Sequence, residues 1–297
     1  MNQFIEQIKM PKGYGWLYFP IPFLLALVMI WNYAESQNID IATQMNLSIE
    51  QIGRTPLFII SVLPLVIGFF ILIFWVKVAH NQKIVTLTTA RPKVDWKRIW
   101  FSFFLWAAIS SLMVLLQYFI EPETLQLNFK PEKFFLFAFF AILLLPFQIA
   151  FEEYLFRGYL MQGIGWATKS RIIPLVITSI MFGLMHLGNP EVDKMGNIIM
   201  VYYIGTGFFL GLITLMDEGL ELALGFHASN NIIGALLVTA DWTAFQTDSI
   251  FIDKAEPTAG LAIIAPVFVV FPILFYIFSK KYQWKNISQK LTFNREL

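Results

Sequence analysis

The sequence predicts an all-α integral membrane protein, and three observations lead to this fold class. Of the 297 residues, 57% are hydrophobic and only 14% are charged. The mean hydropathy is +0.64, whereas soluble domains are only about 45–50% apolar and carry about 25% charged residues. Apolar runs of the roughly 20 residues needed to cross the hydrocarbon core recur along the chain. We therefore expect a bundle of about eight transmembrane helices around a polar intramembrane cavity.

The expected membrane spans follow one another without a long polar linker, repeat or low-complexity tract. They are residues 16–33, 57–76, 99–120, 134–153, 172–187, 198–216, 220–240 and 258–278. Several contain proline, which a helix bundle tolerates because neighbouring helices re-satisfy the freed backbone groups. We expect residues 1–297 to form a single polytopic membrane domain.

Lysine and arginine are concentrated in alternate loops, which predicts the orientation of the chain in the membrane. One set of loops holds 15 of the 21 basic residues, and it comprises the N-terminal segment and residues 77–98, 158–171, 217–219 and 279–297. The other set holds five of them and comprises residues 34–56, 121–133, 188–197 and 241–257. This bias predicts a multi-pass protein of the cell inner (plasma) membrane with both termini in the cytoplasm.

Charge and cysteine content exclude several classes of function. A net charge of +1 without a basic domain gives nucleic acid no binding surface, so we expect none as a partner. The chain has no cysteine, which excludes disulfides, a thiolate nucleophile and cysteine-ligated metals. We expect the protein to be surrounded by the lipid bilayer.

Ionisable and amide side chains inside the expected spans are the candidate functional residues, because such groups are costly in hydrocarbon. They are Glu152, Glu153, Arg157, His186, His227 and Asn231. Glu153 and Arg157 are four residues apart, so they can pair along one helix. Glu152 points about 100° away from Glu153 and is free to face another group. His227 and Asn231 are also four residues apart and share a helix face.

Depth in the membrane favours a long fourth helix that continues past Arg157 to about Ala167. If the chain reverses near Lys169, both Glu152 and His186 lie about 25 Å along their helices from that turn. The two side chains then come level. A fourth helix ending at Glu153 would instead leave them near opposite membrane faces.

These residue types together suit the hydrolysis of an amide. A carboxylate beside an imidazole can hold and deprotonate a water molecule. A histidine and an asparagine one turn apart can donate hydrogen bonds to the oxyanion. A zinc site formed by Glu152, His186 and His227 is an alternative, because two histidines and a glutamate form a catalytic zinc set. The H-E-x-x-H signature is absent, so our preferred interpretation needs no metal or other cofactor.

The same residues resemble the CAAX prenyl protease type II and bacteriocin-processing family of intramembrane proteases, abbreviated CPBP or Abi. The family pattern is E-E-x-x-x-R, then F-x-x-x-H, then H-x-x-x-N. The chain reads Glu152-Glu153-x-x-x-Arg157, Phe182-x-x-x-His186 and His227-x-x-x-Asn231 in that order, within about residues 134–240.

The resemblance implies eight membrane helices and a polar cavity open to the cytoplasm. It also implies that Glu152 and His186 activate the water while His227 and Asn231 bind the oxyanion, with Glu153 and Arg157 in support. Members of the family are described both as glutamate proteases and as metalloproteases. Some act on prenylated CAAX proteins, and many bacterial members are linked to bacteriocin maturation or self-immunity.

Three classes of function therefore remain after the sequence has been considered. The first is an intramembrane endopeptidase, of the glutamate or the zinc type, acting on a peptide or protein substrate at the cytoplasmic side. The second is a non-catalytic membrane protein, such as a bacteriocin-immunity factor. The third is a transporter with a Glu/His proton relay, which the lack of matching motifs in the two halves disfavours.

Overall fold

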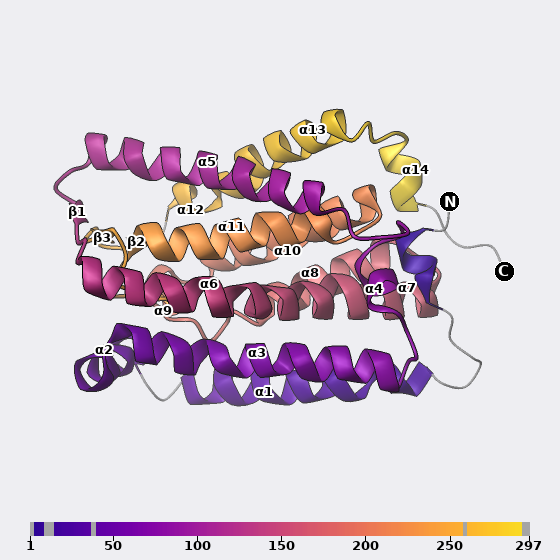
Figure 1. Ribbon diagram of the computed structural model, residues 1–297, viewed down its shortest axis with the longest axis horizontal. Coiled ribbons are helices and arrows are strands. Elements are labelled where there is room, and N and C mark those ends of the chain that lie inside the picture. The colour runs from indigo at the N-terminus through magenta and orange to yellow at the C-terminus, as the bar shows by residue number, and fades with distance from the viewer. Residues whose placement is uncertain (1–2, 9–14, 37–39, 258–259, 293–297) are drawn as a thin grey trace.

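A computed structural model of the chain describes residues 3–8, 15–36, 40–257 and 260–292. The described part is mostly helical, and its long helices lie side by side along one axis (Figure 1). Its helices are the 3₁₀ turns η1 (Phe4–Gln7) and η2 (Gly15–Tyr18), α1 (Pro20–Ser36), α2 (Ile41–Ile52), α3 (Arg54–Val78), α4 (Ile84–Thr88), α5 (Trp96–Ile120), α6 (Pro131–Glu153), the π-helix η3 (Tyr154–Leu160), α7 (Met161–Thr168), α8 (Ile172–Leu184), α9 (Pro190–Met195), α10 (Ile198–Asp217), α11 (Glu221–Leu237), α12 (Leu261–Ala265), the π-helix η4 (Pro266–Val270), α13 (Phe271–Lys281) and α14 (Ile287–Thr292).

Six helices in the described residues are long and apolar enough to cross a membrane. They span Gly15–Glu35, Arg54–Val78, Trp96–Ile120, Pro131–Thr168, Ile198–Asp217 and Ile263–Lys281. A helix of 25 residues is about 37 Å long, which exceeds the hydrocarbon core of about 30 Å. The chain is therefore an integral membrane protein.

The expected count of about eight spans is not reached, because two of the expected helices are short. α8 has 13 residues and α11 has 17. α8 ends at Leu184, where the next backbone bonds tighten to turns such as His186 N–H to Gly183 O. α11 ends where Val238 enters a strand. α11 packs against α5, α6 and α10, so its neighbours rather than lipid cover most of its length.

The expected long fourth helix is confirmed. α6, η3 and α7 form one continuous helix from Pro131 to Thr168, 38 residues in all. It ends at Lys169, whose φ of 56° lies in the left-handed region and reverses the chain. The π-helical turn begins directly after Glu152 and Glu153, and such turns frequently occur at functional sites.

A small sheet closes one end of the bundle, so the fold is not purely helical. Its strands are β1 (Leu125–Leu127), β2 (Val238–Thr239) and β3 (Phe251–Asp253). β3 lies in the middle, antiparallel to β1 with Leu127 opposite Phe251, and parallel to β2. Figure 1 shows the sheet and α2 at the end opposite to α14 and η1.

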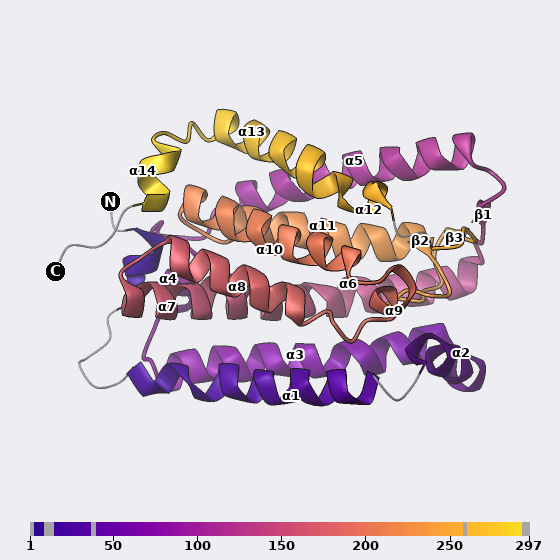
Figure 2. The same ribbon diagram turned by 180° about the vertical axis from the view of Figure 1, so that it is seen from behind.

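Two glycines allow the helices that carry the candidate site to approach closely. A Cβ on Gly207 of α10 would lie 2.6 Å from the carbonyl oxygen of Ser179 on α8. A Cβ on Gly225 of α11 would collide with the carbonyl oxygen of Ile99 on α5. Small residues at such crossings are typical of membrane helix packing. Figure 2 shows α8 and α10 side by side on the face turned away in Figure 1.

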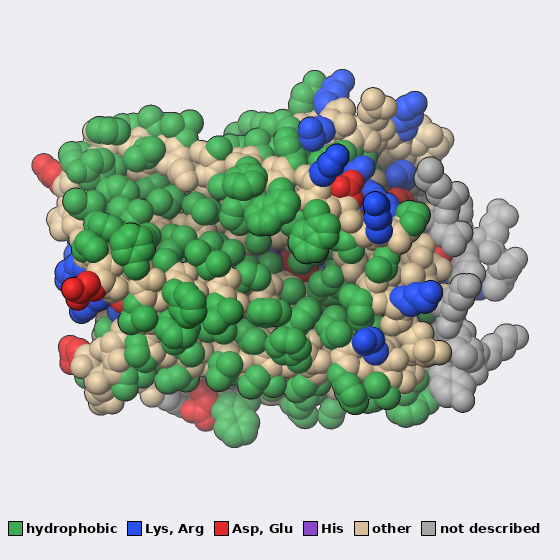
Figure 3. All heavy atoms as spheres, in the orientation of Figure 1, with side chains coloured by type: hydrophobic (Ala, Val, Ile, Leu, Met, Phe, Trp, Pro, Cys, Tyr) green, Lys and Arg blue, Asp and Glu red, His purple; other side chains and the backbone are tan. Residues whose placement is uncertain are grey.

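The surface divides into apolar sides and charged ends. Apolar side chains cover most of the long face in Figure 3, and Lys and Arg gather at the end where α13 and α14 lie. Exposed leucine, isoleucine and phenylalanine side chains on α3, α5 and α6 suit contact with lipid chains. Of the basic residues in the orientation argument, Lys9, Lys12 and Arg295 lie outside the described residues.

Candidate active site

The two glutamates at the end of α6 are both buried and have different partners. The Arg157 guanidinium donates to Glu153 Oε1 at 2.9 Å, and both side chains are fully buried. This confirms the expected pairing of Glu153 and Arg157 along one helix. Arg157 also donates to the Gly207 carbonyl at 3.2 Å and lies over the Phe182 ring. A buried ion pair of this kind requires such additional partners.

His227 of α11 lies between the two carboxylates. Its Nδ1 is 2.7 Å from Glu153 Oε1, and its Nε2 is 3.7 Å from Glu152 Oε2. Because a carboxylate accepts, Nδ1 carries the hydrogen in the first contact. The second distance exceeds a hydrogen bond but is short enough for a bridging water. Glu153 therefore fixes the ring and directs Nε2 towards Glu152.

Asn231, one helical turn beyond His227, is linked to Glu152 by the side chain of Gln148, which the sequence analysis did not identify. Asn231 Nδ2 donates to Gln148 Oε1 at 3.2 Å, and Gln148 Nε2 donates to Glu152 Oε1. Gln148 is the only polar residue in the apolar run from Phe134 to Phe151, and it precedes Glu152 by four residues. That position was the signal that could have identified it.

His186 lies just beyond the end of α8, beside the same cluster. Its Nδ1 is 2.8 Å from the Phe182 carbonyl oxygen, so Nδ1 donates and Nε2 is left as an acceptor. Its ring stacks on Tyr203 at a centroid distance of 4.3 Å. The rings of His186 and His227 both lie against Phe182, at 5.0 and 5.9 Å.

The structure thus brings five of the six predicted residues into one contact network, while His186 contacts Phe182 and Tyr203 instead. The networked residues are Glu152, Glu153, Arg157, His227 and Asn231. Two of the three zinc candidates, Glu152 and His227, are neighbours. No group of three His, Asp or Glu side chains within the described residues is arranged to hold a metal ion.

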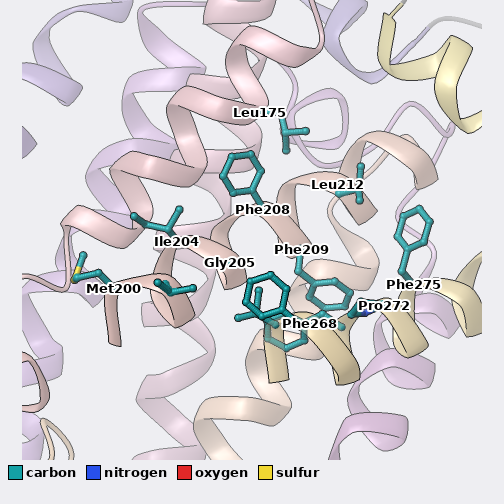
Figure 4. A pocket seen from close by; sticks show the side chains of 13 residues that line it. Leu175, Met200, Ile204, Gly205, Phe208, Phe209, Leu212, Phe268, Pro272 and Phe275 are labelled. Carbon is teal, nitrogen blue, oxygen red and sulfur yellow. The ribbon is translucent and has the colours of Figure 1, made fainter. Parts of the chain in front are cut away.

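A hollow in the middle of the apolar face shows acidic side-chain atoms at its floor (Figure 3). A separate cavity of about 690 Å³ lies between α10 and α13 on the other face (Figure 4). Apolar side chains such as Phe208, Phe268 and Phe275 line it, and it contains no candidate site residue. Phe209 lines this cavity and also packs on Phe226, next to His227. The cavity is a hydrocarbon environment without groups for catalysis.

Comparison with known proteins shows that this region is similar to a known family. Residues 131–233 match the family described as type II CAAX prenyl endopeptidase Rce1-like, and this range contains every residue of the network. Residues 131–233 are therefore similar to the Rce1-like domain of the CPBP/Abi family, which is a family of peptidases.

A curated relative is similar to about half of the chain. The uncharacterized protein YyaK of Bacillus subtilis (strain 168) is 30% identical over 155 residues, which are 52% of this chain and 52% of YyaK. The matched part spans about half the length of that relative. No solved structure matches the chain.

Proposed function

We propose that this protein is an intramembrane endopeptidase that hydrolyses a peptide bond with a water molecule activated by Glu152. The match of residues 131–233 to a peptidase family supports the reaction class. The observation that carries the assignment is the chain of contacts from Arg157 through Glu153 to His227, which directs His227 Nε2 at Glu152. The other carboxylate, that of Glu152, is then available to activate the water molecule.

The proposed reaction begins with a water molecule held near Glu152 Oε2. Glu152 acts as a general base and takes a proton from the water. The oxygen of the water attacks the carbonyl carbon of the substrate at the same time. His186 Nε2, which is an acceptor in this tautomer, helps to orient the water. The proton on Glu152 passes to the leaving amine when the C–N bond breaks, so the carboxylate is regenerated.

The oxyanion that forms during the attack needs hydrogen-bond donors close to Glu152. A His227 ring protonated on both nitrogens donates Nδ1–H to Glu153 and has Nε2–H left for the oxyanion. Asn231 Nδ2 carries two hydrogens, and only one of them is used by Gln148. Two donors in a buried site stabilise developing charge more than they would in water.

The proposed substrate is a peptide or protein that reaches the site from the cytoplasmic side of the membrane. In this proposal the reaction needs no metal ion. Zinc held by Glu152, His186 and His227 is the alternative that the chelation experiment in the Discussion tests. Whether the substrate carries a prenyl group is decided by offering paired peptides with and without it.

The decisive experiment compares Glu152→Gln with the wild type and with Glu132→Gln. All three proteins are reconstituted in liposomes with a farnesylated and an unmodified peptide library, and cleavage is followed by mass spectrometry. Loss of the general base should reduce the rate by about 10²–10⁴-fold. Glu132 is exposed in the first turn of the same helix, so Glu132→Gln should cleave as the wild type does. Equal cleavage by wild type and Glu152→Gln, or no cleavage by the wild type, contradicts the proposal.

A further inference from the structure

A continuous chain of partly and fully buried hydrogen bonds crosses the bundle from α5 to the candidate base. Trp106 Nε1 donates to Asn230 Oδ1, Asn230 Nδ2 donates to Asn231 Oδ1, and Asn231 Nδ2 donates to Gln148 Oε1, each at 3.2 Å. Gln148 Nε2 then donates to Glu152 Oε1. We call these five side chains the amide chain. It links three helices, α5, α11 and α6.

The direction of the amide chain is fixed by its first member. An indole N–H can only donate, so the Trp106 end requires the oxygen of Asn230 and leaves its nitrogen for the next bond. Each following amide accepts through oxygen and donates through nitrogen. Turning any one amide by 180° would place two donors or two acceptors against each other at both of its ends. The arrangement therefore specifies where each amide oxygen and nitrogen lies.

We propose that Gln148 is a positioning residue of the reaction, because it fixes the Asn231 amide and the Glu152 carboxylate relative to each other. The inference rests on the proposed function, and it adds a residue that touches neither the water nor the oxyanion. Gln148 is 2% exposed, and it bonds to both groups at once. The side chain of Trp106, through Asn230, supplies the direction of that arrangement.

Removing Gln148 has a specific consequence for the transition state. Without the Gln148 oxygen, the Asn231 amide keeps only the bond that its oxygen accepts from Asn230, and its nitrogen loses its acceptor. An Asn231 amide turned by 180° would present its oxygen to the oxyanion and repel it. Glu152 Oε1 would also lose its donor, and its carboxylate could rotate away from the water. Both changes act on the charge that develops during reaction, so we expect kcat to fall while KM stays nearly constant.

The test uses Gln148→Met, which keeps the length of the side chain and removes both hydrogen-bonding functions. Its matched control is Gln162→Met on the same continuous helix. Gln162 is fully buried and bonds to Gln82, the Phe4 carbonyl and the Thr86 carbonyl, away from the site. Gln148→Met should lower kcat about 10–10²-fold, below the loss of about 10²–10³-fold for a missing oxyanion donor. Gln162→Met should keep the wild-type kcat per folded molecule.

A second variant tests the amide chain from its far end. Trp106→Phe removes the indole donor and keeps an aromatic ring against Phe226, which Trp106 contacts at a centroid distance of 4.8 Å. It should lower kcat about 3–10-fold in the wild type, and the losses of Trp106→Phe and Gln148→Met should not add in the double variant, since both changes act on the Asn231 amide. If Gln148→Met does not fold, this variant carries the test alone.

The possible outcomes separate this inference from the proposed function. Wild-type kcat in Gln148→Met, or equal losses in Gln148→Met and Gln162→Met, overturns the positioning role. An unchanged kcat in Trp106→Phe contradicts the role of Trp106 in fixing the direction of the amide chain. Additive losses in the double variant contradict that role as well. In each case a large loss in Glu152→Gln still supports the peptidase. Wild-type cleavage by Glu152→Gln instead removes the proposed function itself.

Discussion

Glu152 and Glu153 are adjacent in sequence, yet their surroundings differ in ways that separate their tasks. Glu153 Oε1 accepts from Arg157 and from His227, so it is bound on two sides. Glu152 accepts from the neutral amide of Gln148, and its other oxygen faces His227 at 3.7 Å. Because a buried charge without a partner is strongly destabilising, Glu153 stabilises Arg157 and orients His227. Glu152 is free for a water molecule.

Substituting Glu153 by glutamine should lower the stability of the protein more than it changes the chemistry at Glu152. The change leaves the Arg157 charge buried without its carboxylate, and breaking such a pair costs about 3–5 kcal/mol. Thermal unfolding in detergent, followed by tryptophan fluorescence, measures the effect. Glu152→Gln is the control and should unfold close to the wild-type temperature. A Glu153→Gln protein as stable as the wild type would contradict the role of the ion pair.

Asn231→Ala should lower kcat about 10²–10³-fold while substrate binding stays largely intact, because an oxyanion donor acts in the transition state. Steady-state kinetics on the best cleaved peptide separates kcat from KM. A rise in KM by a similar factor, with an unchanged kcat, would show that Asn231 binds the substrate instead.

Metal removal separates the two forms of the peptidase. In the proposed mechanism Glu152 activates the water directly, so protein treated with 1,10-phenanthroline and dialysed should cleave at the untreated rate. A zinc enzyme would lose activity and regain it on addition of zinc, since the metal generates the nucleophile. Restoration by zinc of an inactive, metal-depleted protein would therefore replace the proposed mechanism by the metal-dependent one.

At the scale of elements, the turn between α10 and α11 connects the site helix to the surrounding segments. Asp217 pairs at 2.8 Å with Arg91, which precedes α5, and also with Arg98 in the first turn of α5. It accepts from Trp284 Nε1 as well. Glu221, in the first turn of α11, also pairs with Arg91. These contacts fix the start of the helix that carries His227 and Asn231.

Glu218, the next residue along the chain, contacts a different set of segments. Glu218 pairs with Arg171 of the turn before α8 at 2.9 Å and with Lys290 of α14 at 3.6 Å. It also accepts from the backbone N–H of Phe4 at 2.8 Å. This turn has no basic residue of its own, and the structure supplies basic side chains from three other parts of the chain. It therefore lies at the same end as the basic loops.

Asp217→Asn should destabilise this end of the bundle by about 1–3 kcal/mol, because the hydrogen bonds to two partly exposed arginines lose the negative charge of the carboxylate. The unfolding temperature in detergent measures the change. Asp193→Asn on α9, where the carboxylate is exposed, is the matched control and should have no effect. Equal unfolding temperatures for the two variants would show that the turn is held by packing alone.

At the scale of the whole molecule, an apolar belt separates two polar ends. η1 and α14 pack at the same end, where Ile5, Ile287 and Leu291 share one apolar cluster. The sheet of β1, β2 and β3 lies at the other end (Figure 1). The basic bias of the loops predicts that the end with η1 and α14 faces the cytoplasm.

Single cysteines test this orientation, and the cysteine-free wild type supplies an unlabelled background. Lys93, Glu123 and Asp241 are exposed, with Lys93 at one end and the other two in loops at the opposite end. A membrane-impermeant maleimide added to intact cells should label Glu123→Cys and Asp241→Cys, and label Lys93→Cys only after permeabilisation. Labelling of Lys93→Cys in intact cells would reverse the predicted topology.

The sequence by itself determined the membrane character, the long fourth helix and the residues of the candidate site. Hydropathy depends only on composition along the chain, and the i, i+4 spacing places Glu153 against Arg157 in any α-helix. The rise per residue alone predicts a helix to about Ala167, and the helix does extend to Thr168. The polar residues in apolar runs identified Glu152, His227 and Asn231 because charge and amide groups are costly there.

Only the tertiary structure decided which of these groups touch. Contacts between α6 and α11 join residues about 80 positions apart, and no local periodicity encodes that His227 Nδ1 bonds to Glu153 rather than to Glu152. The short lengths of α8 and α11 also depend on their neighbours, because a helix covered by protein need not span the lipid alone. The part played by Gln148 arose in the same way, since an amide gains its direction from the partners that packing places on either side of it.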